Sequence, residues 1–320
     1  MSSAEPTPTA DATGVSVVIV NYRTPELSVV AAASALDDGA IRVVIVDNAS
    51  GDGSADRFRA LPDSRLRVLE HDRNAGFGTA ANLGAREADG EVVVFLNSDA
   101  RLRRGALAAM AAGLAPTAGR AVIGPRLVGE DGAIQRSAGL VPRPDDLLLR
   151  GLGVQRVSRA ISRVPILGRL LGRTRIATEY DQATVARATI DVTMVSGACL
   201  AIGRTAFTDL GGFDDRYFMY FEDADLCRRA TRAGWPVRYV PDAVVDHIGG
   251  ASSSGDYRFG PWHAASMIRY LRDWHGAAGV SIGLAILSLR AIGHVVTLRP
   301  NAGTAVAALR AGILSARERS

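Results

Sequence analysis

The chain has 320 residues, of which 48% are hydrophobic, 22% are charged and 6% are aromatic. This composition is typical of a globular protein with a sizeable core, and it excludes disordered, collagenous and disulfide-framework proteins. The 37 basic residues, all Arg, and the 33 acidic residues give a net charge of +4, which is too balanced to indicate a nucleic-acid-binding protein. The length allows one large domain or two smaller ones.

The N-terminus is small and polar, with neither the basic nor the apolar region of a secretory signal. We expect residues 1–13 to form a disordered leader. The two cysteines, Cys199 and Cys227, fit no zinc-binding spacing, and they predict buried thiols in a reducing cytosol.

Short β-branched runs alternate with segments of helical spacing over the first hundred residues. The expected strands are 15–20, 41–46, 66–70 and 91–96, and the expected helices are 25–36, 54–61 and 79–88. Three of these strands are nearly continuous apolar runs, as in strands that are covered on both faces. The alternation predicts right-handed βαβ crossovers and a mainly parallel sheet, with ligands beyond the carboxyl ends of its strands.

Asparagine is concentrated at those strand ends. Five of the six Asn residues lie in the first hundred positions, and Asn21, Asn48 and Asn97 directly follow expected strands. An Asn side chain offers hydrogen-bond donors and acceptors and also tolerates turn geometry. A turn role would explain any one of them, but the grouping favours a polar binding site.

A carboxylate, Asp99, follows the strand expected at 91–96. A buried carboxylate is costly without a partner, and this one is placed to hold Mg²⁺ or Mn²⁺ against diphosphate oxygens. A helix N-cap is the alternative role. His247, which follows another short apolar strand, is a second ligand if it faces Asp99, and a structural residue otherwise.

An acidic cluster lies further along the chain, and it contains Asp214, Asp215, Glu222, Asp223 and Asp225. Glu222 and Asp223 open a segment of helical spacing, where they could simply complement the helix dipole. The aromatic residues beside them favour a partly dry pocket, in which a carboxylate can be tuned as a general base. These aromatic residues are Tyr217, Phe218, Tyr220 and Phe221.

The glycine-rich segment 74–84 fits neither the P-loop nor the dinucleotide-binding pattern. Its glycines can instead let the backbone approach a flat ligand closely.

Seven motifs occur in order: VSVVIVNYRTPEL, VVIVDNASGDGS, HDRNAGFGTAANLGA, FLNSDA, VSGACLAIGRTAF, GGFDDRYFMYFEDADLCRRATRAGWPVRYVP and DHIGGAS. Together they resemble the inverting nucleotide-sugar glycosyltransferases of family 2, and among them the bacterial rhamnosyltransferases of cell-wall linker and O-antigen type. The resemblance implies a GT-A fold over 14–275, a Rossmann-like α/β sheet flanked by helices. Residues 14–115 would form its nucleotide-sugar-binding half and 116–275 its acceptor and catalytic half, followed by a helical amphipathic tail, 276–320.

The resemblance also implies roles for individual residues. The base and ribose of the nucleotide would contact Asn21, Tyr22, Asp47 and Asn48. The rest of the nucleotide-sugar pocket would include Asn74, Gly76, Phe77, Gly78, Asn82, Asn97 and Ser98. Asn97 stands where the family has the first Asp of its DxD motif, so Asp99 and His247 would be the protein ligands of Mg²⁺ or Mn²⁺.

In the catalytic half, the resemblance makes Asp223 the base and pairs it with Glu222. The acceptor would contact Met194, Ser196, Gly197 and Tyr220. Met194 stands where relatives often carry a Trp, which implies a different acceptor or a different way of binding it, and a core-filling role for Met194 is the alternative. The metal would neutralise the diphosphate leaving group, and one displacement would invert the sugar without an enzyme nucleophile. A hydrolase would instead need an acid–base pair that flanks the bond.

The implied donor is dTDP-L-rhamnose, with a UDP- or GDP-sugar as the alternative. The implied acceptor is a hydroxyl of a polyprenyl-diphosphate-linked sugar or a polysaccharide in cell-envelope synthesis. A non-catalytic nucleotide-sugar-binding scaffold is a rival of another class. A nucleotidyltransferase would carry a Gly-rich, basic N-terminal signature, which this chain lacks. The oligomeric state is left open.

Two segments, 147–176 and 274–317, carry Arg and apolar residues but no acids. Arg156, Arg159 and Arg163 are spaced for one helical face, as in helices that bind anionic membranes, although a solvated basic face is the alternative. Residues 277–298 approach spanning length but include Arg290 and His294, which are unfavourable at mid-bilayer. We therefore expect the protein to attach to the surface of a bacterial membrane at its cytoplasmic face. A location free in the cytoplasm is the alternative.

Overall fold

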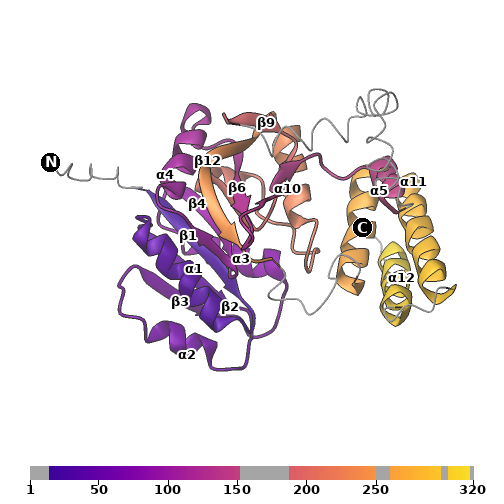
Figure 1. The fold of residues 1–320 in the computed structure, drawn as a ribbon, viewed down its shortest axis with the longest axis horizontal. Coiled ribbons are helices and arrows are strands. Elements are labelled where there is room, and N and C mark those ends of the chain that lie inside the picture. The colour runs from indigo at the N-terminus through magenta and orange to yellow at the C-terminus, as the bar shows by residue number, and fades with distance from the viewer. Residues whose placement is uncertain (1–13, 152–186, 250–259, 297–301, 318–320) are drawn as a thin grey trace.

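The computed structural model describes residues 14–151, 187–249, 260–296 and 302–317. The expected leader and the expected helical face of Arg156, Arg159 and Arg163 lie outside the described residues. The described chain forms a twisted sheet flanked by helices, and the C-terminal helices gather beside this layer (Figure 1). The C-terminal group lies to the right in that view.

The first hundred residues form the strands and helices expected from their periodicity. In chain order these are β1 (Val15–Asn21), α1 (Pro25–Asp37), β2 (Arg42–Asp47), α2 (Ser54–Arg59), β3 (Leu66–Glu70), α3 (Phe77–Arg86) and β4 (Val92–Asn97). The four strands are all parallel, in the order β3-β2-β1-β4. The carboxyl ends of these strands therefore share one edge of the sheet, as expected.

The rest of the chain extends this sheet and then leaves it. Its elements are β5 (Ala100–Leu102), α4 (Ala106–Leu114), a 3-10 turn (Ala115–Thr117), β6 (Val122–Val128), β7 (Ile134–Gln135), β8 (Ala138–Gly139), α5 (Pro144–Gly151), β9 (Ile190–Val192), β10 (Met194–Val195), β11 (Cys199–Gly203), α9 (Arg204–Asp209), α10 (Glu222–Arg232), β12 (Val237–His247), α11 (Pro261–Val296) and α12 (Ala302–Arg317).

This second half makes the sheet mixed. Strand β11 is antiparallel to both β4 and β6, whereas β12 is parallel to β6, so the order continues as β4-β11-β6-β12-β5. Strands β6 and β12 thus run in the same direction as β1 to β4, so the sheet is mainly parallel as expected, and β11 and the short strands β5, β7 and β9 run against that direction. The direction of β11 depends on how the long connection after β4 returns to the sheet. The apolar sequence of residues 199–203 does not predict this direction.

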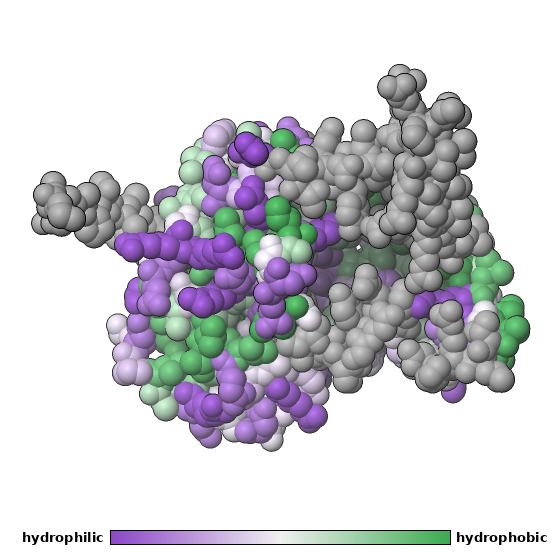
Figure 2. Space-filling model, in the orientation of Figure 1, coloured by the Kyte–Doolittle hydropathy of each residue, from purple (hydrophilic) through white to green (hydrophobic). Residues whose placement is uncertain are grey.

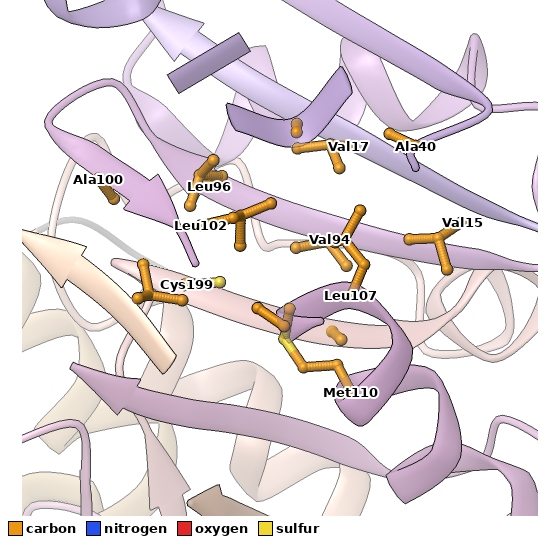
Figure 3. Close-up of a cluster of buried hydrophobic side chains, with 14 of the residues drawn as sticks. Val15, Val17, Ala40, Val94, Leu96, Ala100, Leu102, Leu107, Met110 and Cys199 are labelled. Atoms are coloured by element: carbon orange, nitrogen blue, oxygen red, sulfur yellow. The ribbon is translucent and has the colours of Figure 1, made fainter. Parts of the chain in front are cut away.

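Both faces of the sheet are buried, which explains the continuous apolar runs. On one face, Val94 and Leu96 of β4 pack near Leu107 and Met110 of α4 (Figure 3). On the other face, Phe95 packs in a T-shaped arrangement against Phe213. Burial of each such side chain contributes about 1.5–3 kcal/mol to stability. Cys199 and Cys227, both free thiols, are buried in these two layers, as expected.

The long C-terminal helix α11 consists of two segments. They join at Gly276, whose backbone (φ 61°, ψ −156°) is not helical. The second segment folds back on the first, because a Cβ added at Gly283 would lie 2.7 Å from Cδ1 of Ile268. In a straight helix these two residues would be far apart. The pair of segments and α12 form one apolar cluster that also includes Phe221 and Ala224 at the start of α10.

Candidate active site

A cavity of about 450 Å³ opens at the carboxyl ends of β1 and β4. The start of α10, the end of β12 and the start of α11 complete its wall. Its lining residues are Val20, Tyr22, Asn48, Asn74, Phe77, Asn97, Ser98, Asp99, Pro142, Leu147, Met194, Ser196, Gly197, Ala198, Met219, Tyr220, Phe221, Glu222, Asp223, Ala224, His247 and His263. Three carboxylates therefore face one cavity, and none of these described lining residues is an arginine.

Asp99 and His247 meet because of strand pairing. The short strand β5 runs antiparallel to the end of β12, which sets Ala100 opposite His247. This register brings Nε2 of His247 to 3.5 Å from Oδ1 of Asp99. Asp99 is 8% exposed, so its charge is largely shielded from water.

Gln135 fixes the tautomer of His247. The Nε2 of Gln135 donates to the backbone carbonyl of His247 (2.8 Å), and this bond settles which end of the amide is nitrogen. Its Oε1 then lies 2.8 Å from Nδ1 of His247 and can only accept, so Nδ1 carries the hydrogen. The lone pair of a neutral ring is thus left on Nε2, which is buried without a hydrogen-bond partner in the described structure.

These two side chains fit a hard divalent cation. A carboxylate oxygen and an imidazole nitrogen that is oriented by a second hydrogen bond are ligands of Mn²⁺, and the oxygen suits Mg²⁺ as well. No group of three or more His, Cys, Asp and Glu side chains suited to a metal occurs among the described residues. A cation held here would therefore take most of its ligands from water or from a bound anion.

Asp223 lies at the start of α10, after a strained turn. Tyr220 and Phe221 both have φ of 69°, a region that bulky residues rarely adopt and that recurs at functional sites. The carboxylate accepts hydrogen bonds from the backbone N–H of Gly197 (2.9 Å at Oδ2) and of Ala224 (2.7 Å at Oδ1). Burial raises the pKa of Asp223 above its usual value, and these two bonds oppose the rise.

Glu222 is the more deeply buried of the pair, with 6% of its surface exposed. Burial first, and then the neighbouring charge of Asp223, raises the pKa of Glu222 to about 8. Its Oε2 has no hydrogen-bond partner in the described structure. Burial therefore raises the pKa of both carboxyl groups, and the two N–H groups that donate to Asp223 favour its charged form.

Asn21 and Asp47 do not line the cavity; they brace the loops that carry it. The Nδ2 of Asn21 donates to Asp47 (2.7 Å) and to Ser50 (3.0 Å), and its Oδ1 accepts from Ser28 (2.8 Å). Asp47 accepts a further bond from the Ser50 hydroxyl (2.5 Å). Both side chains are almost fully buried, so the structure uses them to hold the turns after β1 and β2.

Tyr22, Asn48, Asn74, Asn97 and Ser98 do line the cavity. The Nδ2 of Asn48 donates to Oδ1 of Asn74 (3.0 Å), and its Oδ1 accepts from the backbone of Ala75 (3.1 Å). Ser98 accepts a bond from the Thr24 hydroxyl (3.0 Å). These bonds fix the polar half of the cavity wall to the ends of β1, β2 and β4.

The glycine-rich segment joins the two halves of the chain. A Cβ at Gly76 would lie 2.1 Å from the carbonyl oxygen of Phe218, and one at Gly78 would lie 3.1 Å from Cβ of Phe213. Asn82 clamps the backbone of Phe213 from both sides, with bonds of 2.8 and 2.9 Å. Of this segment only Asn74 and Phe77 line the cavity, and Gly76, Gly78 and Asn82 hold the 213–218 loop against it.

The side of the cavity predicted to take an acceptor is less polar. Met194, Ser196, Gly197 and Tyr220 all line it, and so do residues that sequence reasoning did not select. His263 is the chemically notable one, because its ring lies 5.6 Å from that of Tyr220 and 5.2 Å from that of Phe221. Gln135 was also missed; nothing in the sequence links it to His247, which lies far along the chain.

Comparison with known proteins agrees with this arrangement. The family model "Glycosyltransferase like family 2" matches residues 12–258. Over 230 residues the chain is 34% identical to the N-acetylglucosaminyl-diphospho-decaprenol L-rhamnosyltransferase of Mycobacterium tuberculosis, and the match covers 68% of this chain and 69% of that one.

Two solved structures share the fold. S. aureus TarS in complex with UDP-GlcNAc gives a TM-score of 0.56 at 16% identity, over 95% of this chain and 82% of that one. A mannosyltransferase from Pyrobaculum calidifontis in complex with GDP-Man and Mn²⁺ gives 0.51 at 20% identity, over 98% and 89%. Both likenesses support a mixed α/β sheet with flanking helices, which is the GT-A architecture.

Substitution by Gln tests the raised pKa of Glu222. An acid whose pKa is raised on folding binds more protons in the folded state, so it lowers stability as pH rises from about 4.5 towards 8. The E222Q variant lacks this pH-dependent loss of stability, because a glutamine side chain does not titrate in this range. Relative to wild type it should gain on the order of 3–4 kcal/mol between pH 5 and pH 8, measured by urea unfolding. Parallel pH profiles of the two proteins would contradict the buried neutral Glu222.

Proposed function

The chain belongs to glycosyltransferase family 2, and from that premise we propose that it is an inverting, metal-dependent enzyme that transfers L-rhamnose from dTDP-L-rhamnose to a hydroxyl of a polyprenyl-diphosphate-linked sugar. The rhamnosyltransferase relative, named for a decaprenol-linked acceptor, supports this choice of sugar and acceptor. The observation that carries the proposal is that Asp223, Asp99 and His247 line one cavity.

Asp223 acts as the general base. It accepts the proton of the acceptor hydroxyl as that oxygen attacks the anomeric carbon, and the bond from that carbon to the diphosphate oxygen breaks with inversion. The N–H groups of Gly197 and Ala224 hold the carboxylate in place while it faces the cavity. Burial raises the pKa of Asp223, which makes it a stronger base, and Glu222, whose pKa burial raises to about 8, places little negative charge beside it at neutral pH.

Asp99 and His247 would hold Mg²⁺ or Mn²⁺. When bound, the ion neutralises the charge that develops on the diphosphate leaving group. Gln135 orients the His247 ring by accepting from Nδ1 and keeps the Nε2 lone pair available. The cavity supports this assignment, because its carboxylates would repel a diphosphate unless a cation lay between them.

On the donor side, Tyr22, Asn48, Asn74 and Asn97 offer an aromatic ring and amide groups to the nucleotide. Asn21 and Asp47 contribute by holding the turns that present these residues. Hydrogen bonds within the protein thus fix the side chains on the donor half of the cavity. These side chains are therefore already in position when the nucleotide binds.

We also propose that the C-terminal helices dock on the cytoplasmic face of an anionic membrane. One described helix, α11, has the length and apolar composition to cross a membrane, but it folds back at Gly276. Hydrophobic side chains gather at the end of the molecule formed by α11 and α12 (Figure 2). Among them Leu289 is 53% exposed, Ile292 60% and Val296 74%, in a stretch without acids. These features favour interfacial attachment over a span.

The base is tested by Asp223→Asn. An amide cannot take a proton, so we expect kcat for rhamnosyl transfer to fall by about 10²–10⁴-fold. Binding of dTDP, measured by calorimetry, should stay close to wild type. Asp215→Asn is the matched control, because Asp215 belongs to the same acidic cluster but is exposed and lies outside the cavity. Turnover in D223N within tenfold of wild type would refute the base.

The metal ligand is tested by His247→Ala. We expect the Mn²⁺ concentration that gives half-maximal transfer to rise by roughly 10–100-fold, because one of two protein ligands is lost. His71→Ala, which removes a histidine outside the cavity, should leave the Mn²⁺ titration unchanged. An unaltered titration in H247A would remove this residue from the ligand set.

Membrane docking is tested by the double variant Leu289→Asp, Ile292→Asp. Two carboxylates on the exposed apolar surface should abolish flotation with vesicles of phosphatidylglycerol and phosphatidylcholine. Val30→Asp, on an exposed residue of α1, is the matched control and should float as wild type does. Equal flotation of the double variant and wild type would overturn this mode of attachment.

A further inference from the structure

A second cavity, of about 240 Å³, adjoins the first. The two share Pro142, Leu147, Met194 and Ser196, so they meet beside the acceptor side of the first cavity. The remaining lining residues of the second cavity are Arg136, Ser137, Ala138, Gly139, Leu140, Val141, Asp146 and Val195. The proposed function assigns the donor, the cation and the base to the first cavity, and it gives the second cavity no role.

The two cavities differ in charge. Asp99, Glu222 and Asp223 line the first, which has no arginine among its described lining residues. Arg136 is the one arginine on the described walls of the second, where the single carboxylate is Asp146. The planar guanidinium forms paired, charge-assisted hydrogen bonds with phosphate oxygens. The second cavity therefore offers an anion a guanidinium group, which the described lining of the first cavity does not.

The backbone fixes where Arg136 lies. Its guanidinium lies over Gly139, because a Cβ added there would be 2.9 Å from Nη2 of Arg136. The short strands β8 and β10 pair antiparallel, with Gly139 opposite Met194. A side chain at position 139 would therefore displace the guanidinium from β8, so a glycine there allows Arg136 to lie in the second cavity.

The same pair of strands connects Arg136 to the base. The backbone N–H of Ser196 donates to the carbonyl of Ser137 (2.8 Å), and the next N–H along, that of Gly197, donates to Asp223 (2.9 Å). Two hydrogen bonds and a single peptide step therefore link the residue after Arg136 to the catalytic carboxylate. Such a short link holds the two cavities in one fixed relation.

We propose, on the basis of the function proposed above, that Arg136 binds the diphosphate of the lipid-linked acceptor. In that acceptor the attacking hydroxyl and the diphosphate are attached to the same sugar, so a base and an anion site must lie about one sugar apart. The adjoining cavities meet this requirement. The sugar lies across Pro142, Leu147 and Met194, whose apolar surfaces suit the faces of a pyranose ring.

The test compares two soluble acceptors in wild type and Arg136→Ala. One is N-acetylglucosamine diphosphate carrying a short alkyl chain, and the other is the same sugar and chain joined by a simple glycosidic bond. We expect R136A to lower kcat/KM for the diphosphate acceptor by roughly tenfold to a hundredfold, with KM for the donor unchanged. For the neutral acceptor, kcat/KM should change by less than about threefold.

Arg143→Ala is the matched control, because Arg143 lies nearby, pairs with Asp145 and lines neither cavity. It should leave both acceptors unaffected, and Arg136→Lys should restore only part of the rate, since an ammonium lacks the planar fork. Arg136 is exposed, so its removal does not open the core. An unchanged donor KM and melting temperature check the fold directly.

An equal loss with both acceptors, or no loss with either, would overturn the assignment of Arg136 and leave the proposed function intact. A rise in the donor KM would instead indicate that Arg136 binds the donor diphosphate. This result would also overturn the assignment of Arg136 to the acceptor. If wild type glycosylates neither acceptor with any of the dTDP-, UDP- and GDP-sugars, the proposed function itself fails, and this inference fails with it.

Discussion

The hydrogen bond from the backbone N–H of Gly197 to Asp223 joins helix α10 to the central sheet beside the first cavity, and the geometry of the candidate site depends on it. Asp223 belongs to α10, whereas Gly197 follows strand β10 and leads into β11 of the central sheet. The bond stabilises the charged form of a carboxylate that burial would otherwise neutralise. It also ties this carboxylate to the sheet that carries Asn97 and Asp99. A shift of this turn would therefore alter both the charge of Asp223 and its position in the cavity.

The first half of the fold follows from local patterns, because each strand and helix there has its own periodicity and the strands are joined by short βαβ crossovers. The second half does not, because long-range pairing determines it. The end of strand β12 pairs antiparallel with β5, in a register that sets His247 opposite Ala100. The meeting of Asp99 and His247 results from that register. Their residue types predicted a shared metal site, but only the pairing of β5 with β12 places them together.

Motif membership and a place on the cavity wall are different properties here. Asn82 belongs to the same motif as Asn74, yet Asn82 holds the backbone of Phe213 while Asn74 lines the cavity. Sequence alone cannot separate these roles, because an amide suits a backbone clamp as well as it suits a nucleotide. In contrast, Gln135 has no motif at all, and its effect on His247 comes from a tertiary contact. The sequence thus predicts which segments gather around the cavity, but not which of their side chains line its wall.

The charges of the two cavities bear on how one enzyme can tell two diphosphates apart. In the proposed arrangement, a donor diphosphate in the first cavity would face the carboxylates of Asp99 and Asp223, so a cation would have to accompany it. An acceptor diphosphate in the second cavity would face Arg136 and would need no cation. Each substrate would thereby be disfavoured in the other's place, since the carboxylates would repel a bare diphosphate and the guanidinium would gain little from one whose charge a divalent cation already neutralises. This arrangement discriminates by the sign of charge, which requires no difference between the sugars.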